Sequence, residues 1–183
     1  MGLIPMRAAP MSAENPIRVL FICTGNSARS IMAEALLRHW GHERFQAFSA
    51  GAHPRGEVHP LTLETLRRHR LSSEGLRNKS WDEFCGEGKP ELDLVVTVCD
   101  EAAGETCPVL PGAPVQAHWG IADPAAVQGT GEERLHAFRE AYAALDTRVK
   151  LLTALRDDHF AHLRESGLRD ELERIHREAA TGG

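Results

Sequence analysis

The apolar and polar positions of this chain follow two periods, and these periods predict strands that alternate with helices along the sequence. Runs of β-branched and aliphatic residues predict strands, and apolar residues that recur every three or four positions predict helices. The run at 92–99 is apolar almost throughout, which is typical of a strand covered on both faces. The predicted strands span 17–23, 45–50, 92–99 and 115–119, and the predicted helices span 28–40, 60–70 and 130–155.

The last of these helices carries the clearest signals. Thr130 followed by Glu133 predicts a capping box, in which each residue satisfies a backbone N–H of the other. Beyond it, apolar residues recur at spacings of three and four and predict one amphipathic face. These residues are Leu135, Phe138, Tyr142, Leu145, Val149 and Leu152.

Strands that alternate with helices predict an α/β fold with three layers, α/β/α, around a four-stranded parallel sheet. The chain of 183 residues suits one such domain, which we place at 16–156. Residues 1–15 lack the sustained apolar segment of a secretory signal, so no such signal is expected, and we expect them to form a flexible leader. Residues 157–183 are expected to form a helical C-terminal extension of one or two amphipathic helices, broken near Gly167.

The most distinctive stretch joins the first strand to the first helix and is Cys23-Thr24-Gly25-Asn26-Ser27-Ala28-Arg29-Ser30, here called the oxyanion loop. Its N–H groups can converge on one point, where the helix N-terminus adds positive potential, so we expect it to bind a tetrahedral oxyanion. Arg29 adds a charged fork. The same field favours the nucleophilic thiolate of Cys23, and the Ser30 hydroxyl can donate to it. A core cysteine near a surface arginine is the alternative interpretation.

Asp123 follows the fourth predicted strand, so we expect it at the same edge of the sheet as Cys23. A carboxylic acid opposite the nucleophile can protonate an oxygen that would otherwise leave poorly. Pro124 would stiffen the loop that aims this acid. The alternative is an ordinary Asp-Pro turn.

Cys99 ends the third predicted strand, and Cys107 follows it in a loop of small residues. Beside a nucleophilic cysteine, this pair suggests a thiol–disulfide relay. A buried core thiol and an unrelated loop thiol are the alternative. Cys85 lies in a different loop and has no assigned role. His118 is expected to be structural rather than catalytic.

Composition excludes several classes of protein. A net charge of −5 without a basic stripe argues against a nucleic-acid partner. Four cysteines in a chain of this length do not form a disulfide framework, and they favour a reducing compartment, so we expect a cytoplasmic protein. No apolar run reaches transmembrane length, so no membrane association is expected. The ten histidines show no metal-ligand spacing.

Several of these stretches, in this order, resemble the low-molecular-weight protein tyrosine phosphatase superfamily, and most of all the arsenate reductases built on that fold. The resemblance extends over about 17–155 and implies the low-molecular-weight phosphatase fold. It rests on residues 19–30, 32–34, 49–51, 96–100, 107–108, 118–120 and 123–125.

The resemblance implies that the chain is an enzyme that reduces arsenate to arsenite in arsenic detoxification. Cys23 would attack arsenate, Arg29 and the loop amides would neutralise its oxygens, and Asp123 would protonate the departing hydroxide. Cys99 would then attack Cys23 and release arsenite, and Cys107 would carry the oxidation outward as a Cys99–Cys107 disulfide. Phosphate or sulfate would mimic the substrate.

The resemblance also implies an external reductant and no tightly bound cofactor. The reductant is thioredoxin in one branch, glutathione with glutaredoxin in a second, and mycothiol in a third. Many relatives have a cysteine where this chain has Ala28. Some hold a potassium ion near the positions of Asn26, Glu34 and Ser49, which is the only metal site the resemblance suggests. Monomer and homodimer both remain open.

Two other functions remain open from the sequence. A phosphatase for phosphotyrosine or small phosphomonoesters would need the same nucleophile, loop and acid, but not Cys99 and Cys107. Its acid would be expected beside aromatic residues, whereas Asp123 is followed by small residues at 125–126, which favours an inorganic oxyanion. The second is a binding module, an oxyanion or arsenite sensor without turnover.

Overall fold

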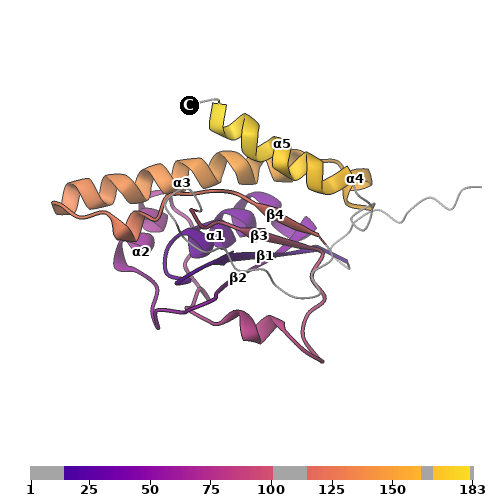
Figure 1. Ribbon diagram of the computed structural model, residues 1–183, viewed down its shortest axis with the longest axis horizontal. Helices are drawn as coiled ribbons and strands as arrows, with labels where there is room; N and C mark the ends of the chain where they lie inside the picture. Colours follow the sequence, from indigo (N-terminus) through magenta and orange to yellow (C-terminus); the bar gives the residue numbers. More distant parts are fainter. Residues whose placement is uncertain (1–14, 101–114, 162–166, 182–183) are drawn as a thin grey trace, which may run out of the picture.

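The chain folds around a four-stranded parallel sheet, which confirms the predicted α/β class. The computed structural model describes residues 15–100, 115–161 and 167–181. The strand order is β2-β1-β3-β4, so the first strand lies in the middle of the sheet (Figure 1). The strands are β1 (Ile17–Cys23), β2 (Phe45–Gly51), β3 (Leu94–Thr97) and β4 (Gln116–His118).

Helices occupy the stretches between and after the strands, close to their predicted positions. In the part of the chain that the structure describes, the connections contain the short 3₁₀ helices η1 (His42–Arg44), η2 (Trp81–Phe84) and η4 (Pro124–Ala126). The α-helices are α1 (Arg29–Gly41), α2 (Pro60–Arg68), α3 (Gly131–Ala154), α4 (Asp157–Ala161) and α5 (Gly167–Thr181).

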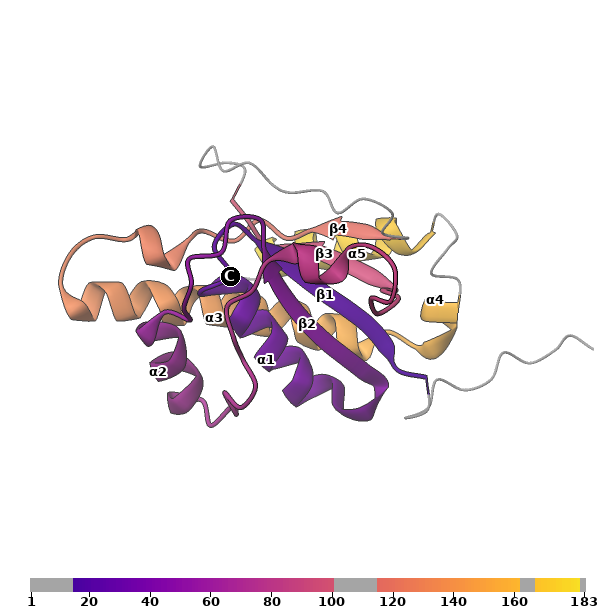
Figure 2. The ribbon, with the colours of Figure 1, turned by 90° about the horizontal axis from the view of Figure 1, so that it is seen from below.

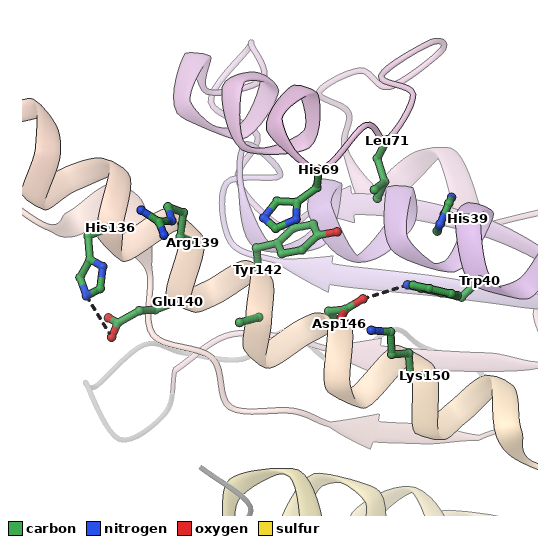
Figure 3. Close-up of a pocket in the computed structure, with 11 residues that line it drawn as sticks. His39, Trp40, His69, Leu71, His136, Arg139, Glu140, Tyr142, Asp146 and Lys150 are labelled. Atoms are coloured by element: carbon green, nitrogen blue, oxygen red, sulfur yellow. Dashed lines mark hydrogen bonds and ion pairs between the residues drawn. The ribbon is translucent and has the colours of Figure 1, made fainter.

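The two faces of the sheet are covered unequally. Alternate residues of β1 point to opposite faces, as the pleat of a strand requires. Val19 and Phe21 belong to the large core shared with the α-helices, whereas Leu20 and Ile22 belong to a small second core. Trp81 and Phe84 of η2 pack on that second core. The α-helices and η2 lie on opposite sides of the sheet (Figures 1 and 2).

The third strand is shorter than the predicted range of 92–99. Val98 still donates its N–H to the carbonyl of Ile22 at 2.8 Å, but β4, the outer partner of β3, has already ended opposite Thr97. With its outer partner gone, the chain leaves the sheet here, although Val98 and Cys99 are fully buried. Burial therefore continues where strand pairing stops.

The long helix α3 begins as its capping box predicts. The Thr130 hydroxyl accepts the N–H of Glu133 at 3.2 Å, and the Glu133 carboxylate accepts the N–H of Thr130 at 2.7 Å. These two bonds satisfy N–H groups that would otherwise lack a partner at the helix start.

The C-terminal segment forms two helices, α4 and α5, on either side of the predicted break near Gly167. Phe160, Leu172 and Ile175 are buried and belong to the same core as β1 and α3. Helix α5 packs along α3 and against β4 (Figure 1). Among the described residues, no helix is long and apolar enough to cross a membrane.

Candidate active site

The oxyanion loop connects the end of β1 to the start of α1, and backbone hydrogen bonds from a neighbouring segment hold it in place. The adjacent segment 52–59 runs beside the loop and donates its backbone N–H groups to the loop's carbonyl oxygens. The pairs, donor first, are Ala52 to Cys23 (3.2 Å), His53 to Thr24 (2.8 Å), Arg55 to Gly25 (3.1 Å) and His59 to Ser27 (2.9 Å).

The outward carbonyls determine where the loop's N–H groups point. In a planar trans peptide the C=O and the following N–H are opposed, so carbonyls held on one side direct N–H groups to the other. The N–H of Asn26 accordingly donates to the sulfur of Cys23 at 3.2 Å. Asn26 has a φ of 45°, a conformation that asparagine tolerates better than most residues. The loop therefore curls around the sulfur of Cys23 with its carbonyls outward, which is the shape that the predicted anion-binding nest requires.

Asn78 ties the oxyanion loop to the segment beside it. Its side-chain amide donates to the carbonyls of Gly25 (2.8 Å) and Asn26 (2.6 Å). Its side-chain oxygen accepts the N–H of Gly56 at 3.0 Å. One side chain thus fixes two loops at once, and its position in a polar segment without periodicity gave no sign of this role.

A chain of buried polar groups lies behind the sulfur of Cys23. The Ser30 hydroxyl lies 2.9 Å from the sulfur of Cys23, which is itself only 2% exposed. The amide nitrogen of Asn26 donates to Ser30 at 2.8 Å and to the hydroxyl of Ser49 at 3.0 Å. Ser49 in turn donates to the carboxylate of Glu34, so the chain ends on a buried negative charge.

Lys79 supplies the positive charge at that end. Its ammonium lies 3.6 Å from the Glu34 carboxylate and 3.3 Å from the Ser49 hydroxyl, with 6% of the side chain exposed. Burial lowers the pKa of Lys79, and Arg77 adds to this, while Glu34 opposes both.

The predicted potassium ligands therefore come together, but they do not fit the ion. The amide nitrogen of Asn26 points toward Ser49, and the Asn26 oxygen accepts the N–H of Lys79 at 2.9 Å. A cation beside Glu34 and Ser49 would meet an NH₂ group and an ammonium. Lys79 was not singled out from the sequence.

Arg29 and Asp123 meet at the carboxyl edge of the sheet, as predicted. The guanidinium of Arg29 is 3% exposed, donates to the carbonyl of Ile121 at 2.9 Å, and lies 3.6 Å from one oxygen of Asp123. The other oxygen of Asp123 accepts the N–H of Ala125 at 3.0 Å and caps η4. The cap fixes one oxygen, so the second oxygen faces the site.

Arg55 approaches the same oxygen of Asp123 from outside. Its guanidinium lies 3.4 Å from that oxygen, and its side chain is 51% exposed. No feature of the sequence distinguished this arginine, because it lies in a short polar loop.

The remaining candidate residues lie at the same edge or outside the described part of the chain. Cys99 follows β3, next to β1, and its carbonyl lies near Gly120 in the loop that leads to Asp123. Cys99 is disulfide-bonded, whereas Cys23 and Cys85 carry free thiols. Cys107 lies outside the described residues.

The histidines near the site have structural contacts. His118 hydrogen-bonds the hydroxyl of Thr97 at 2.9 Å, in keeping with the structural role expected for it. His59 caps α2 by accepting the N–H of Leu61 at 3.1 Å. Burial lowers the pKa of His59, and Arg134 and Arg55 lower it further, which favours the neutral ring that can accept this hydrogen bond. His53 is exposed.

The fold and the arrangement of this site are those of a phosphatase-like enzyme. Residues 18–163 match the family model of the low molecular weight phosphotyrosine protein phosphatases, and the chain belongs to that family.

Within the family, the chain is similar to proteins named arsenate reductase. The arsenate reductase of Bacillus subtilis is 34% identical over 137 residues, which cover 75% of this chain and 94% of the relative. That of Shouchella clausii is 33% identical over 132 residues, covering 72% and 91%.

Solved structures give the same picture. The crystal structure of arsenate reductase from Archaeoglobus fulgidus superposes with a TM-score of 0.60 at 33% identity, covering 75% of this chain and 99% of the other. A tyrosine phosphatase of Erwinia amylovora has a TM-score of 0.59 at 21% identity, covering 84% of this chain and 99% of the other, which shows the fold alone.

Proposed function

We propose that this protein is an arsenate reductase that uses Cys23 as its nucleophile. The observation that carries the proposal is the convergence of Cys23, Arg29 and Asp123 at one edge of the sheet, with the oxyanion loop's carbonyls held outward. The similarity to arsenate reductases over three quarters of the chain supports the same activity.

In the first step, arsenate lies in the nest, and its oxygens accept hydrogen bonds from the loop amides and Arg29. The thiolate of Cys23 attacks arsenic, and an As–S bond forms while an As–O bond breaks. Asp123, in its protonated form, gives its proton to the departing oxygen, which leaves as water. The buried Arg29 stabilises the negative charge throughout.

In the second step, the thiolate of Cys99 attacks the sulfur of Cys23. The S–As bond breaks, its electron pair stays on arsenic, and As(V) becomes As(III), which leaves as arsenite. Cys23 and Cys99 are then joined by a disulfide. Cys107 attacks Cys99, gives a Cys99–Cys107 disulfide, and returns Cys23 to its thiolate form.

The position of Cys99 supports this relay. It follows β3, the strand next to β1, at whose end Cys23 lies. An external thiol protein, thioredoxin or glutaredoxin, would reduce the final disulfide, and no tightly bound cofactor takes part. Because such a relay requires a reducing compartment, we place the protein in the cytoplasm.

The alternative activity is hydrolysis of phosphotyrosine or of a small phosphomonoester. The family match favours it, since the same nucleophile, loop and acid serve a phosphatase. Such an enzyme would not depend on Cys99 or Cys107.

Arsenite production with each thiol donor separates these activities. Purified protein is given arsenate with thioredoxin and its reductase, or with glutathione and glutaredoxin, and Cys99→Ser and Cys107→Ser are compared with wild type. Thioredoxin-driven turnover that is lost in both variants supports the three-thiol relay. Glutaredoxin-driven turnover that survives Cys107→Ser would support the reductase activity and refute the transfer of the disulfide to Cys107. Robust phosphomonoester hydrolysis without arsenite refutes the reductase.

A further inference from the structure

Arg55 connects the oxyanion loop to the candidate acid. Its backbone N–H donates to the carbonyl of Gly25 at 3.1 Å, and its guanidinium lies 3.4 Å from the carboxylate of Asp123. The two ends of one residue therefore touch the two parts of the site between which a bound oxyanion would lie.

The stem of Arg55 lies directly on the loop. A Cβ atom at Gly25 would come within 2.8 Å of Nε of Arg55 and within 3.0 Å of its Cγ. Because residue 25 is glycine, the arginine side chain can pass across the loop at this distance. The guanidinium is thereby directed over the nest toward Asp123.

Two guanidinium groups thus flank one carboxylate oxygen from different sides. Arg29 is 3% exposed and forms the inner side, whereas Arg55 is 51% exposed and forms the outer side. Asp123 itself is 20% exposed between them. An oxyanion that enters from solvent would meet Arg55 before it meets Arg29.

We propose that Arg55 is a substrate-binding residue that recognises the outward oxygen of a free inorganic oxyanion. Asp123 must be protonated to act as the acid, and a neutral carboxyl group no longer pairs with a guanidinium. Arg55 then exchanges this partner for the oxyanion, which is a stronger acceptor because of its charge. This inference rests on the proposed function and specifies its substrate class.

The same geometry discriminates against aryl phosphates. In arsenate or phosphate the outward oxygen is a charged or hydroxyl oxygen that can accept from Arg55. In an aryl monoester this oxygen carries the ring, so it is a poor acceptor, and the ring would have to pass the Arg55 side chain. Arg55 therefore adds affinity for the inorganic oxyanion that the ester does not receive.

The test compares Arg55→Met, Arg55→Lys and the control Arg68→Met. Arg68 is 52% exposed and pairs with Glu64 on α2, so it matches Arg55 in type and exposure. Binding of inorganic phosphate to the reduced protein is measured by calorimetry without any thiol donor, and the KM for p-nitrophenyl phosphate is measured alongside.

Loss of one charge-assisted contact should weaken phosphate binding by about tenfold in Arg55→Met. Arg55→Lys, which keeps the charge but not the fork, should lie between Arg55→Met and wild type, and Arg68→Met should match wild type. The KM for p-nitrophenyl phosphate should change much less than the phosphate affinity.

Phosphate affinity within twofold of wild type in Arg55→Met would overturn the proposal, as would an equal loss for phosphate and the aryl ester. Because phosphate binding involves no reduction, this result is separate from the fate of the reductase. A wild-type protein that binds phosphate through Arg55 but produces no arsenite would refute only the proposed function.

Discussion

The hydroxyl of Ser30 lies 2.9 Å from the sulfur of Cys23, and the network behind it fixes which way its proton points. The amide nitrogen of Asn26 can only donate, and it donates to the Ser30 oxygen. Ser30 is therefore left to direct its own proton at the sulfur. A hydrogen-bond donor aimed at the sulfur stabilises the thiolate and does not stabilise the neutral thiol to the same extent.

Ser30→Ala should slow alkylation of Cys23 by iodoacetamide at pH 7 on the order of tenfold, because a hydrogen bond to a charged group contributes about 1.5–3 kcal/mol. Ser72→Ala is the control, since Ser72 is exposed and its hydroxyl accepts the N–H of Glu74, far from Cys23 in the sequence. Equal alkylation rates in Ser30→Ala and wild type would show that the hydroxyl does not act on the sulfur.

Asp123→Asn should lower kcat for arsenate by about 10²–10⁴-fold, the range expected for loss of a general acid. Asparagine keeps a side-chain oxygen for the N–H of Ala125, so the cap on η4 is preserved. Phosphate binding should be retained, because a negative charge is removed near the anion. Asp158→Asn, at an exposed position, is the control. A kcat within threefold of wild type in Asp123→Asn would contradict the acid role.

Lys79→Met should destabilise the protein by about 3 kcal/mol, because Glu34 would lose its buried partner. Adding Glu34→Gln should recover part of this loss. Lys150→Met, which breaks the exposed pair with Asp146, should cost less than about 1 kcal/mol. Urea denaturation measures all four proteins.

The position of the Lys79 ammonium leads to a separate prediction about potassium. Wild-type turnover should be equal in KCl and NaCl at the same ionic strength, because Lys79 already places a positive charge beside Glu34 and Ser49. A specific increase in KCl would show that the ion binds in spite of Lys79.

Acid should destabilise the fold through His176. Burial lowers its pKa below 6.5, with further lowering from Arg148 of α3, His118 of β4 and Arg177 of α5. Below about pH 6.5 the unfolded chain then binds more protons at this residue than the folded chain, so stability falls as pH falls. The stability that the neutral His176 contributes is fully present above that pH.

The measurement is the urea midpoint at pH 7.5 and pH 5.5. His176→Gln should reduce the loss of stability between them, whereas the exposed His136→Gln should not. The reduction will be partial, because the pKa of His59 is also lowered. An unchanged loss in His176→Gln would mean that α5 is not coupled to proton uptake.

Much of the fold was predictable because its strands are buried on both faces. The continuous apolar runs at β1 and β3 suit strands in the interior of a sheet, where both faces are covered. Parallel pairing of these strands then places their carboxyl ends at the same edge. This reasoning located the oxyanion loop and Asp123 at one edge. The true end of β3 was not predictable, because it depends on where the partner strand β4 stops.

The polar residues that support the site were not predictable in the same way. Arg55, Asn78 and Lys79 lie in segments without hydrophobic periodicity, where sequence pattern carries no information on neighbours. Their roles arise from hydrogen bonds between loops that are distant in the sequence, such as Asn78 to Gly25. Only a folded chain shows that these loops touch.

The relay through Cys99 and Cys107 is a prediction of a different kind. Cys99 directly follows Val98, whose N–H donates to the carbonyl of Ile22 near the end of β1, but Cys107 is outside the described residues. The roles of these two thiols therefore depend on chemistry rather than on geometry.

A single-turnover reaction tests the central claim most directly. The protein is fully reduced, freed of reductant, mixed with excess arsenate, and assayed for arsenite and for remaining thiols, with Cys23→Ser in parallel. We predict about one arsenite per chain and the loss of two thiols in wild type, and neither in Cys23→Ser. Wild-type protein that yields no arsenite and keeps all its thiols, while hydrolysing p-nitrophenyl phosphate, would contradict the assignment as an arsenate reductase.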